Sequence, residues 1–196
     1  MQINVLWIDD QPNEAFIDKA DKVGVYIEVR ENVDAGIDEL LNSSTSYDAI
    51  ILDANCISHN DGSKETDISA LVYALRMITA NQITIPWFVY SGGGFSGEES
   101  INIIVRAYER TYDEKGWYKK PVEINELFAK IKQVVPDTAT YKIKEKYSEI
   151  FSFYPNVKEL VDILLYFERM SIVFPLHLFS TSDRVNISIK TSKRRF

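Results

Sequence analysis

The 196-residue chain has one cysteine, no long apolar segment and, toward its end, no glycine. Because Cys56 is the only cysteine, a disulfide within the chain is excluded, and the composition suits a reducing compartment. No uninterrupted apolar run approaches the roughly 18 residues that cross a bilayer, and no basic, cleavable apolar segment follows Met1. We therefore expect a cytoplasmic protein that does not engage a membrane.

Charge and glycine are unevenly distributed along the chain. Residues 137–196 contain ten Lys or Arg and seven Asp or Glu, a balance of +3, which leaves −10 for residues 1–136 given the net charge of −7. No glycine follows Gly116. Together the two shifts predict a domain over residues 1–136 and a separate unit over residues 137–196.

Short apolar runs alternate with longer amphipathic segments in residues 1–136. The runs are continuous, as in strands of a parallel sheet that is covered on both faces. The amphipathic segments predict helices that connect these strands by right-handed crossovers, hence an α/β fold with a doubly wound, five-stranded parallel sheet. The predicted strands are Ile3–Ile8, Val25–Arg30, Tyr47–Leu52, Ile85–Tyr90 and Gly116–Tyr118, and the predicted helices are Asn13–Lys22, Val33–Asn42, Ser69–Ala80, Glu98–Tyr112 and Ile124–Val135.

The segment 137–196 has a different pattern. It predicts two helices, Tyr141–Phe153 and Asn156–Met170, with Asn156 as the N-cap of the second, and then a short strand over Arg184–Lys190. Its many aromatic residues and its lack of glycine favour packing against protein, including a second copy, over a DNA-binding helix-turn-helix. We expect a mainly helical extension that binds a downstream protein partner or forms a homodimer. Direct nucleic-acid binding through the basic stretch Arg184–Arg195 is the disfavoured alternative.

Polar side chains follow the carboxyl ends of four predicted strands. Asp9 and Asp10 follow the first strand, Asp53 the third, Ser91 the fourth and Lys120 the fifth. Because ligands of such sheets bind beyond the carboxyl ends of the strands, we expect these side chains to meet at one edge. Crowded carboxylates stay ionised when a cation lies among them, which predicts a hard divalent metal such as Mg²⁺.

The same residues have the chemistry of phosphoryl transfer. Asp53 can attack phosphorus and form an acyl phosphate, while Lys120 brings a mobile positive charge to the phosphoryl oxygens. Ser91 offers a hydroxyl donor to the same group. Phosphoryl transfer depends mainly on positioning and charge neutralisation, both of which this set provides.

With these residues in this order, residues 1–136 resemble the receiver domain of two-component response regulators. The resemblance implies a flavodoxin-like sheet of order 2-1-3-4-5. It further implies that Asp53 is the phosphoacceptor and a metal ligand, that Asp10 binds Mg²⁺ directly, and that Asp9 acts through a metal-bound water. The main-chain carbonyl of Asn55 would complete the metal shell.

The resemblance extends to signalling. It implies that Ser91 and Trp117 form the switch, and that the Lys120–Pro121 peptide bond is cis. A histidine kinase or phosphotransfer protein would supply the phosphoryl group. The domain would catalyse its own phosphorylation and dephosphorylation without being a turnover enzyme. We recognise no family in residues 137–196.

Some features depart from the family pattern. The family's proline a few residues after the phosphoacceptor is missing. The spacings from Asp53 to Ser91, 38 positions, and from Ser91 to Lys120, 29 positions, are longer than typical. They predict a longer third helix with its loop and a longer fourth helix. An interaction module that does not use phosphorylation therefore stays open. An Mg²⁺-dependent phosphohydrolase is disfavoured, since haloacid-dehalogenase-type enzymes have a second Asp where Asn55 stands.

Simpler readings exist for several of these residues. The acidic pair could cap the first helix, Ser91 could be a turn residue, Trp117 could belong to the core, and Lys119 competes with Lys120. The G-x-G-x-x-G pattern of residues 92–97 follows the fourth strand, not the first, so we read it as a flexible loop beside Ser91 and not as a dinucleotide site.

Overall fold

The computed structural model describes residues 2–59, 61, 66–92, 97–108 and 112–173. Its centre is a parallel sheet of five strands in the order β2-β1-β3-β4-β5, which confirms the predicted topology. The strand bounds are β1 Ile3–Ile8, β2 Val25–Arg30, β3 Ala49–Leu52, β4 Trp87–Ser91 and β5 Trp117–Lys119.

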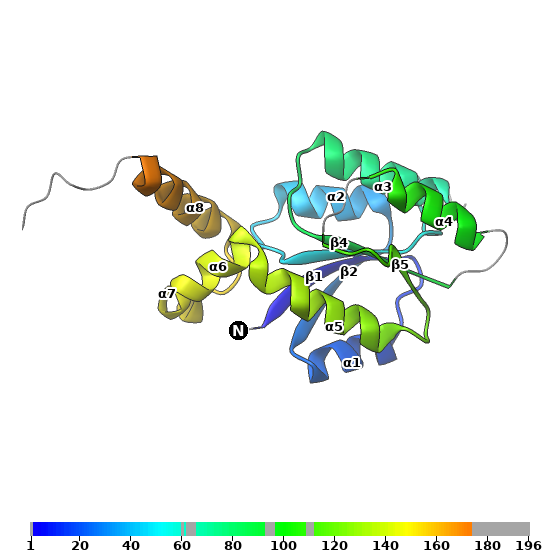
Figure 1. Cartoon of the computed structure of the whole chain (residues 1–196), viewed down its shortest axis with the longest axis horizontal. Helices are drawn as coiled ribbons and strands as arrows, with labels where there is room; N and C mark the ends of the chain where they lie inside the picture. Colours follow the sequence, from blue (N-terminus) through cyan, green and yellow to red (C-terminus); the bar gives the residue numbers. More distant parts are fainter. Residues whose placement is uncertain (1, 60, 62–65, 93–96, 109–111, 174–196) are drawn as a thin grey trace, which may run out of the picture.

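Helices cover both faces of the sheet, as a doubly wound fold requires (Figure 1). Two helices lie on one face and three on the other. The first layer is α1 (Glu14–Lys22) and α5 (Ile124–Val134), and the second is α2 (Val33–Asn42), α3 (Ser69–Ala80) and α4 (Gly97–Arg106).

Each face of the sheet has its own hydrophobic core. Along β1, Leu6 and Ile8 pack toward α2, α3 and α4, while Val5 and Trp7 pack toward α1 and α5. The continuous apolar run of this strand therefore reflects burial on both faces. Helix α2 lies so close to β1 that a Cβ at Gly36 would be 2.2 Å from Cδ1 of Ile8.

The connection before β5 differs from the prediction. Helix α4 ends at Arg106, so the prediction of a longer fourth helix was wrong; the extra residues form the connection to β5. Tyr112 belongs to this connection, and its hydroxyl accepts a hydrogen bond of 2.7 Å from the main-chain N–H of Trp87. Helical periodicity does not reveal long-range contacts of this kind, so the sequence alone does not locate the end of α4.

The extension contains three helices in its described part. They are α6 (Ala139–Lys146), α7 (Ser148–Phe153) and α8 (Lys158–Val173), preceded by a 3₁₀ turn, η1 (Val135–Asp137). The single helix predicted over Tyr141–Phe153 is thus broken at Tyr147, whose ψ of 33° leaves the helical region. The predicted strand Arg184–Lys190 lies outside the described residues. No helix of the described ranges is both long and apolar enough to cross a bilayer.

Asn156 does not cap α8 as predicted. The helix begins only at Lys158, and Asn156 has a φ of 61°, in the left-handed region that Asn tolerates better than most residues. Its main-chain carbonyl accepts a hydrogen bond of 2.6 Å from the N–H of Ser46. Asn156 therefore turns the chain against the segment that leads into β3.

The extension packs against the end of the sheet where the strands begin (Figure 1). Nζ of Lys144, on α6, donates a hydrogen bond of 2.8 Å to Oδ1 of Asp48, and both side chains are buried. Nζ of Lys158 donates to the carbonyl of Leu40 at the end of α2, at 2.8 Å. These contacts lie at the opposite end of the strands from the predicted acidic site.

Candidate functional site

Three carboxylates meet where β1 and β3 end. Ile8 and Leu52 are paired in the sheet, so the residues that follow them are brought together. One carboxylate oxygen each from Asp9, Asp10 and Asp53 lies within 4.8 Å of the others. The main-chain N–H of Asp53 also donates to the carbonyl of Ile8 at 2.9 Å, which joins the two strand ends. Clustered carboxylate oxygens are the donors that a hard divalent cation prefers.

Lys120 reaches this cluster from the end of β5. Its Nζ donates a hydrogen bond of 2.9 Å to Oδ2 of Asp53 and a second, short one to Oδ2 of Asp9. The Lys120–Pro121 peptide bond is cis. Lys119, the competing residue, is exposed, and its main-chain N–H donates to Glu123. The lysine beside the proline is therefore the one that contacts the acids.

Burial and charge act together on these groups. Burial raises the pKa of Asp9, the negative charge of Asp53 adds to this effect, and Lys120 opposes it. Burial alone would lower the pKa of Lys120, but the carboxylates of Asp53 and Asp9 outweigh it and raise the pKa, so the ammonium form is kept. With every group ionised, three carboxylates and one ammonium leave a charge of −2, which one divalent cation would neutralise.

Ser91 lies at the same edge as the last residue of β4. Its carbonyl accepts the main-chain N–H of Lys120 at 2.8 Å, and its side chain is fully buried. No described residue hydrogen-bonds its hydroxyl. A buried hydroxyl without a partner costs about 1–3 kcal/mol, so an acceptor from a bound group would be stabilising there. Ser91 is thus an ordered strand residue and not the turn residue of the simpler reading.

The turn after β3 contains Asn55 and Cys56. The main-chain N–H of Asn55 is 3.5 Å from Oδ1 of Asp53, so the turn folds back toward the acidic cluster. Cys56 is buried, and burial, with the charges of Asp53, Asp10 and Asp9, raises the pKa of its thiol to about 12. Cys56 is therefore a core residue and not a reactive thiolate.

The acidic pair does not cap the first helix. Asn13 is the N-cap of α1, and its side chain accepts the N–H of Ala15 at 2.8 Å. Asp9 instead accepts the N–H of Gln11 at 2.9 Å within the loop. Among the described residues, Oδ2 of Asp10 accepts a weak hydrogen bond of 3.4 Å from the side-chain amide of Gln11. Both acids are therefore available to the cluster.

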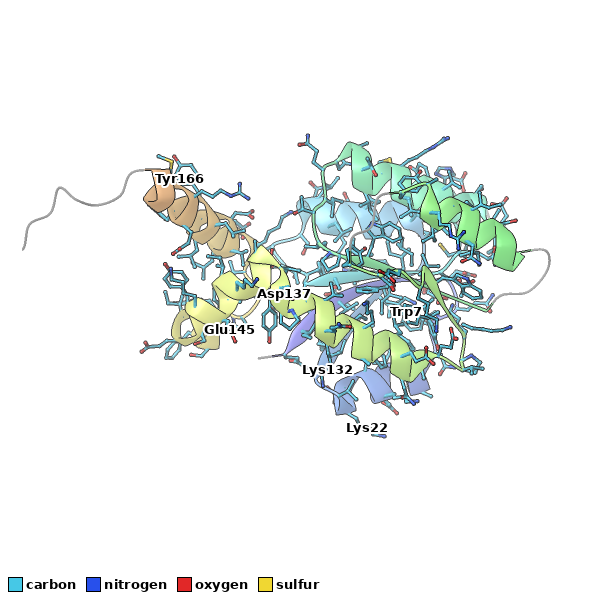
Figure 2. The ribbon with its side chains drawn as sticks, in the orientation of Figure 1. Trp7, Lys22, Lys132, Asp137, Glu145 and Tyr166 are labelled. Atoms are coloured by element: carbon cyan, nitrogen blue, oxygen red, sulfur yellow. The ribbon has the colours of Figure 1, made fainter. Side chains whose placement is uncertain are left out.

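Two aromatic residues near Lys120 were not predicted as site residues from the sequence. Nζ of Lys120 is 5.7 Å from the ring centroid of Tyr90 and 5.8 Å from that of Trp7, within the range of a cation–π interaction. Both rings belong to the core on the α1 and α5 side, where Figure 2 labels Trp7. Tyr90 comes one residue before Ser91, and Trp7 comes two residues before Asp9. This closeness in sequence to the predicted site residues was the available signal for both. Trp117, by contrast, is half-buried and packs toward the α2, α3 and α4 side.

A pocket of about 400 Å³ opens beside Lys120 on the α1 and α5 side. Its apolar walls come from both helices and the sheet, and include Trp7, Phe16, Tyr90 and Ile124. Lys19 and Asn13 contribute polar groups at its lining. The pocket reaches Lys120, whereas Asp9, Asp10 and Asp53 do not line it.

His59 and the glycine-rich loop do not add to the cluster of carboxylates among the described residues. His59 is half-exposed, and its Nδ1 is 3.3 Å from Oδ2 of Asp34, which is not one of the clustered acids. Most of the glycine-rich loop, residues 93–96, lies outside the described residues, so its predicted flexibility stays a prediction.

Comparison with known proteins identifies the fold. No protein-family model and no curated protein matches the chain. Among solved structures, the receiver domain of a Francisella response regulator is 15% identical, with a TM-score of 0.51 over 68% of this chain and 97% of that domain. The receiver domain of a sensor histidine kinase from Pseudomonas aeruginosa, described with a magnesium ion coordinated in its active-site cleft, is 16% identical, with a TM-score of 0.50 over 70% of this chain and 100% of that domain.

These similarities confirm the receiver fold expected from the sequence. At such identities they concern the fold alone. The shared part, 68–70% of the chain, corresponds in size to residues 1–136.

Proposed function

We propose that this chain is a phosphorylation-controlled receiver. Asp53 accepts a phosphoryl group from a histidine kinase or phosphotransfer protein with Mg²⁺, and the modified domain changes a protein–protein output. The observation that carries the proposal is the contact of Lys120 with both Asp9 and Asp53 inside a cluster of three carboxylates on a receiver fold. The chain is then a phosphoacceptor and not a turnover enzyme.

The residues present fit a magnesium ion. Asp10, Asp53 and the main-chain carbonyl of Asn55 would hold it, with Asp9 acting through a water, and their oxygens are suitable hard donors. When bound, Mg²⁺ supplies positive charge to the phosphoryl oxygens. The magnesium described in the cleft of the Pseudomonas receiver domain supports the same assignment.

In the transfer step, a carboxylate oxygen of Asp53 attacks the phosphorus of a phosphohistidine. The new P–O bond forms an acyl phosphate, the P–N bond breaks, and its electron pair returns to the imidazole of the donor. Lys120, already 2.9 Å from Asp53, neutralises a phosphoryl oxygen. Ser91, whose buried hydroxyl has no partner among the described residues, donates a hydrogen bond to another.

The output would follow from this new contact. Ser91 would be drawn toward the phosphoryl group, and Trp117 on the neighbouring strand would change its packing. The extension, residues 137–196, would deliver the output by binding protein. In this proposal it stays attached to the receiver domain through the buried contact of Lys144 with Asp48.

Intact mass spectrometry after incubation with acetyl phosphate and Mg²⁺ tests the proposal. The wild type should gain one phosphate, and chelation of Mg²⁺ should prevent the gain. Asp53→Asn should abolish it, whereas Asp18→Asn, an exposed acid on α1, should not. The proposal fails if the wild type gains nothing in excess Mg²⁺ and also does not bind beryllofluoride.

Two further measurements separate the alternatives. A receiver-like module without phosphorylation would keep full partner binding in Asp53→Ala. Steady release of phosphate from an ester would instead indicate a phosphohydrolase.

A further inference from the structure

Helix α8 has two apolar faces. One packs against α6 and α7 through Val161, Leu164 and Leu165. The other, which we term the outer stripe, consists of Ile163, Tyr166, Phe167 and Met170, which are 52%, 60%, 60% and 37% exposed.

The outer stripe has the spacing of a helix–helix interface. Its positions follow the i, i+3, i+4, i+7 rule, so they form one continuous row along α8. Tyr166 lies toward the end of the helix farthest from the sheet (Figure 2). Tyr, Phe and Met are enriched at protein interfaces, and contiguous apolar surface of this kind marks a binding site on a soluble domain.

We propose that the outer stripe is a homodimer interface in which α8 packs antiparallel against α8 of a second copy. The inference rests on the proposed function in one respect: it names the outer stripe as the surface through which the proposed protein–protein output acts. A two-fold axis between Tyr166 and Phe167 makes the stripe self-complementary, because it places Ile163 opposite Met170 of the second copy.

Charge complementarity favours antiparallel packing of α8 against α8 of a second copy. Asp162 and Arg169 are exposed, lie seven positions apart and so flank the stripe on one side. In an antiparallel pair related by a two-fold axis, equivalent flanks face each other. Asp162 then lies near Arg169 of the second copy, and symmetry makes this ion pair twice. A parallel pair would bring opposite flanks together and lose both.

Sedimentation equilibrium of the full chain tests the interface. The wild type should be a dimer at micromolar concentration, and Tyr166→Ser should weaken dimerisation about tenfold or more because it removes a central aromatic side chain. Tyr26→Ser is the matched control: Tyr26 on β2 is 51% exposed, similar to Tyr166, and its removal should leave the dimer unchanged.

A charge exchange tests the direction of packing. Asp162→Arg and Arg169→Asp should each weaken dimerisation several-fold by facing like charges, and the double variant should restore it. Circular dichroism of each variant checks that α8 is retained.

Any of four results would overturn the inference. The first three are a monomeric wild type at about 100 μM, a dimer insensitive to Tyr166→Ser, and a charge exchange that does not restore association. A monomer that dimerises only after removal of residues 174–196 would also overturn it, because that segment would then cover the stripe. All these measurements are repeated on Asp53→Asn, so loss of phosphoryl acceptance and loss of the dimer are distinguishable.

Discussion

Lys144 offers a sharp test of how the extension, residues 137–196, is joined to residues 1–136, which contain the sheet. Its side chain is 2% exposed, and its Nζ lies 2.8 Å from Oδ1 of Asp48, whose side chain is 0% exposed. The carbonyl of Ser46, at 3.3 Å, is a further acceptor, and the other oxygen of Asp48 accepts the N–H of Asn4 at 2.9 Å. Lys144→Ala would leave a carboxylate buried without its counter-ion.

The expected loss of stability is large. Removing one partner of a buried ion pair costs about 3–5 kcal/mol, against a total unfolding free energy of about 5–15 kcal/mol for a typical domain. Lys142→Ala is the matched control on the same helix. Its ion pair with Asp137 is exposed, with side chains 58% and 87% accessible, so its loss should cost no more than about 1 kcal/mol.

Urea unfolding followed by tryptophan fluorescence reports the stability of the part of the chain that contains Asp48. All three tryptophans, Trp7, Trp87 and Trp117, lie on strands of the sheet, whereas Lys144 lies in the extension. With a slope of about 2–3 kcal/mol per molar urea, Lys144→Ala should lower the midpoint by roughly 1–2.5 M.

Partial rescue is the internal check. Adding Asp48→Asn to Lys144→Ala removes the stranded charge and should recover part of the loss. If Lys144→Ala and Lys142→Ala shift the urea midpoint of tryptophan fluorescence equally, the buried contact does not couple the extension to the sheet and the reasoning is refuted.

Three other predictions follow from the site and the core. Lys120→Ala should slow phosphorylation by acetyl phosphate about 100-fold, by the magnitude typical of a charge-stabilising donor, whereas Lys119→Ala should not; equal rates for both would remove Lys120 from the chemistry. Cys56 should resist a thiol reagent at pH 8 in the native protein and react fully in urea, because it is buried with its pKa raised to about 12; rapid native labelling would contradict this. Gly36→Ala should cost about 1–3 kcal/mol in urea unfolding because its Cβ would overlap Ile8, and Ile8→Ala in the same chain should cancel part of the added cost; additive losses would exclude the overlap.

The fold and the acidic cluster could be predicted because their signals are local. Most strands are short, largely apolar runs, and Asp9, Asp53 and Lys120 each come directly after a strand. Parallel strands place their carboxyl ends at one edge, so the meeting of these side chains follows from strand order alone. The α1 and α2 bounds followed from periodicity, and their caps, Asn13 and Asn32, are residue types that favour this position.

Tertiary structure decided the features that depend on distant partners. Lys144 and Asp48 are 96 residues apart, and nothing in the polar pattern of α6 distinguishes Lys144 from the exposed Lys142. The conformation of Asn156 depends on its contact with Ser46, and the place of Trp7 at Lys120 depends on the sheet register. Periodicity reports which face of an element is buried, but the partner that buries it is a property of the assembled fold.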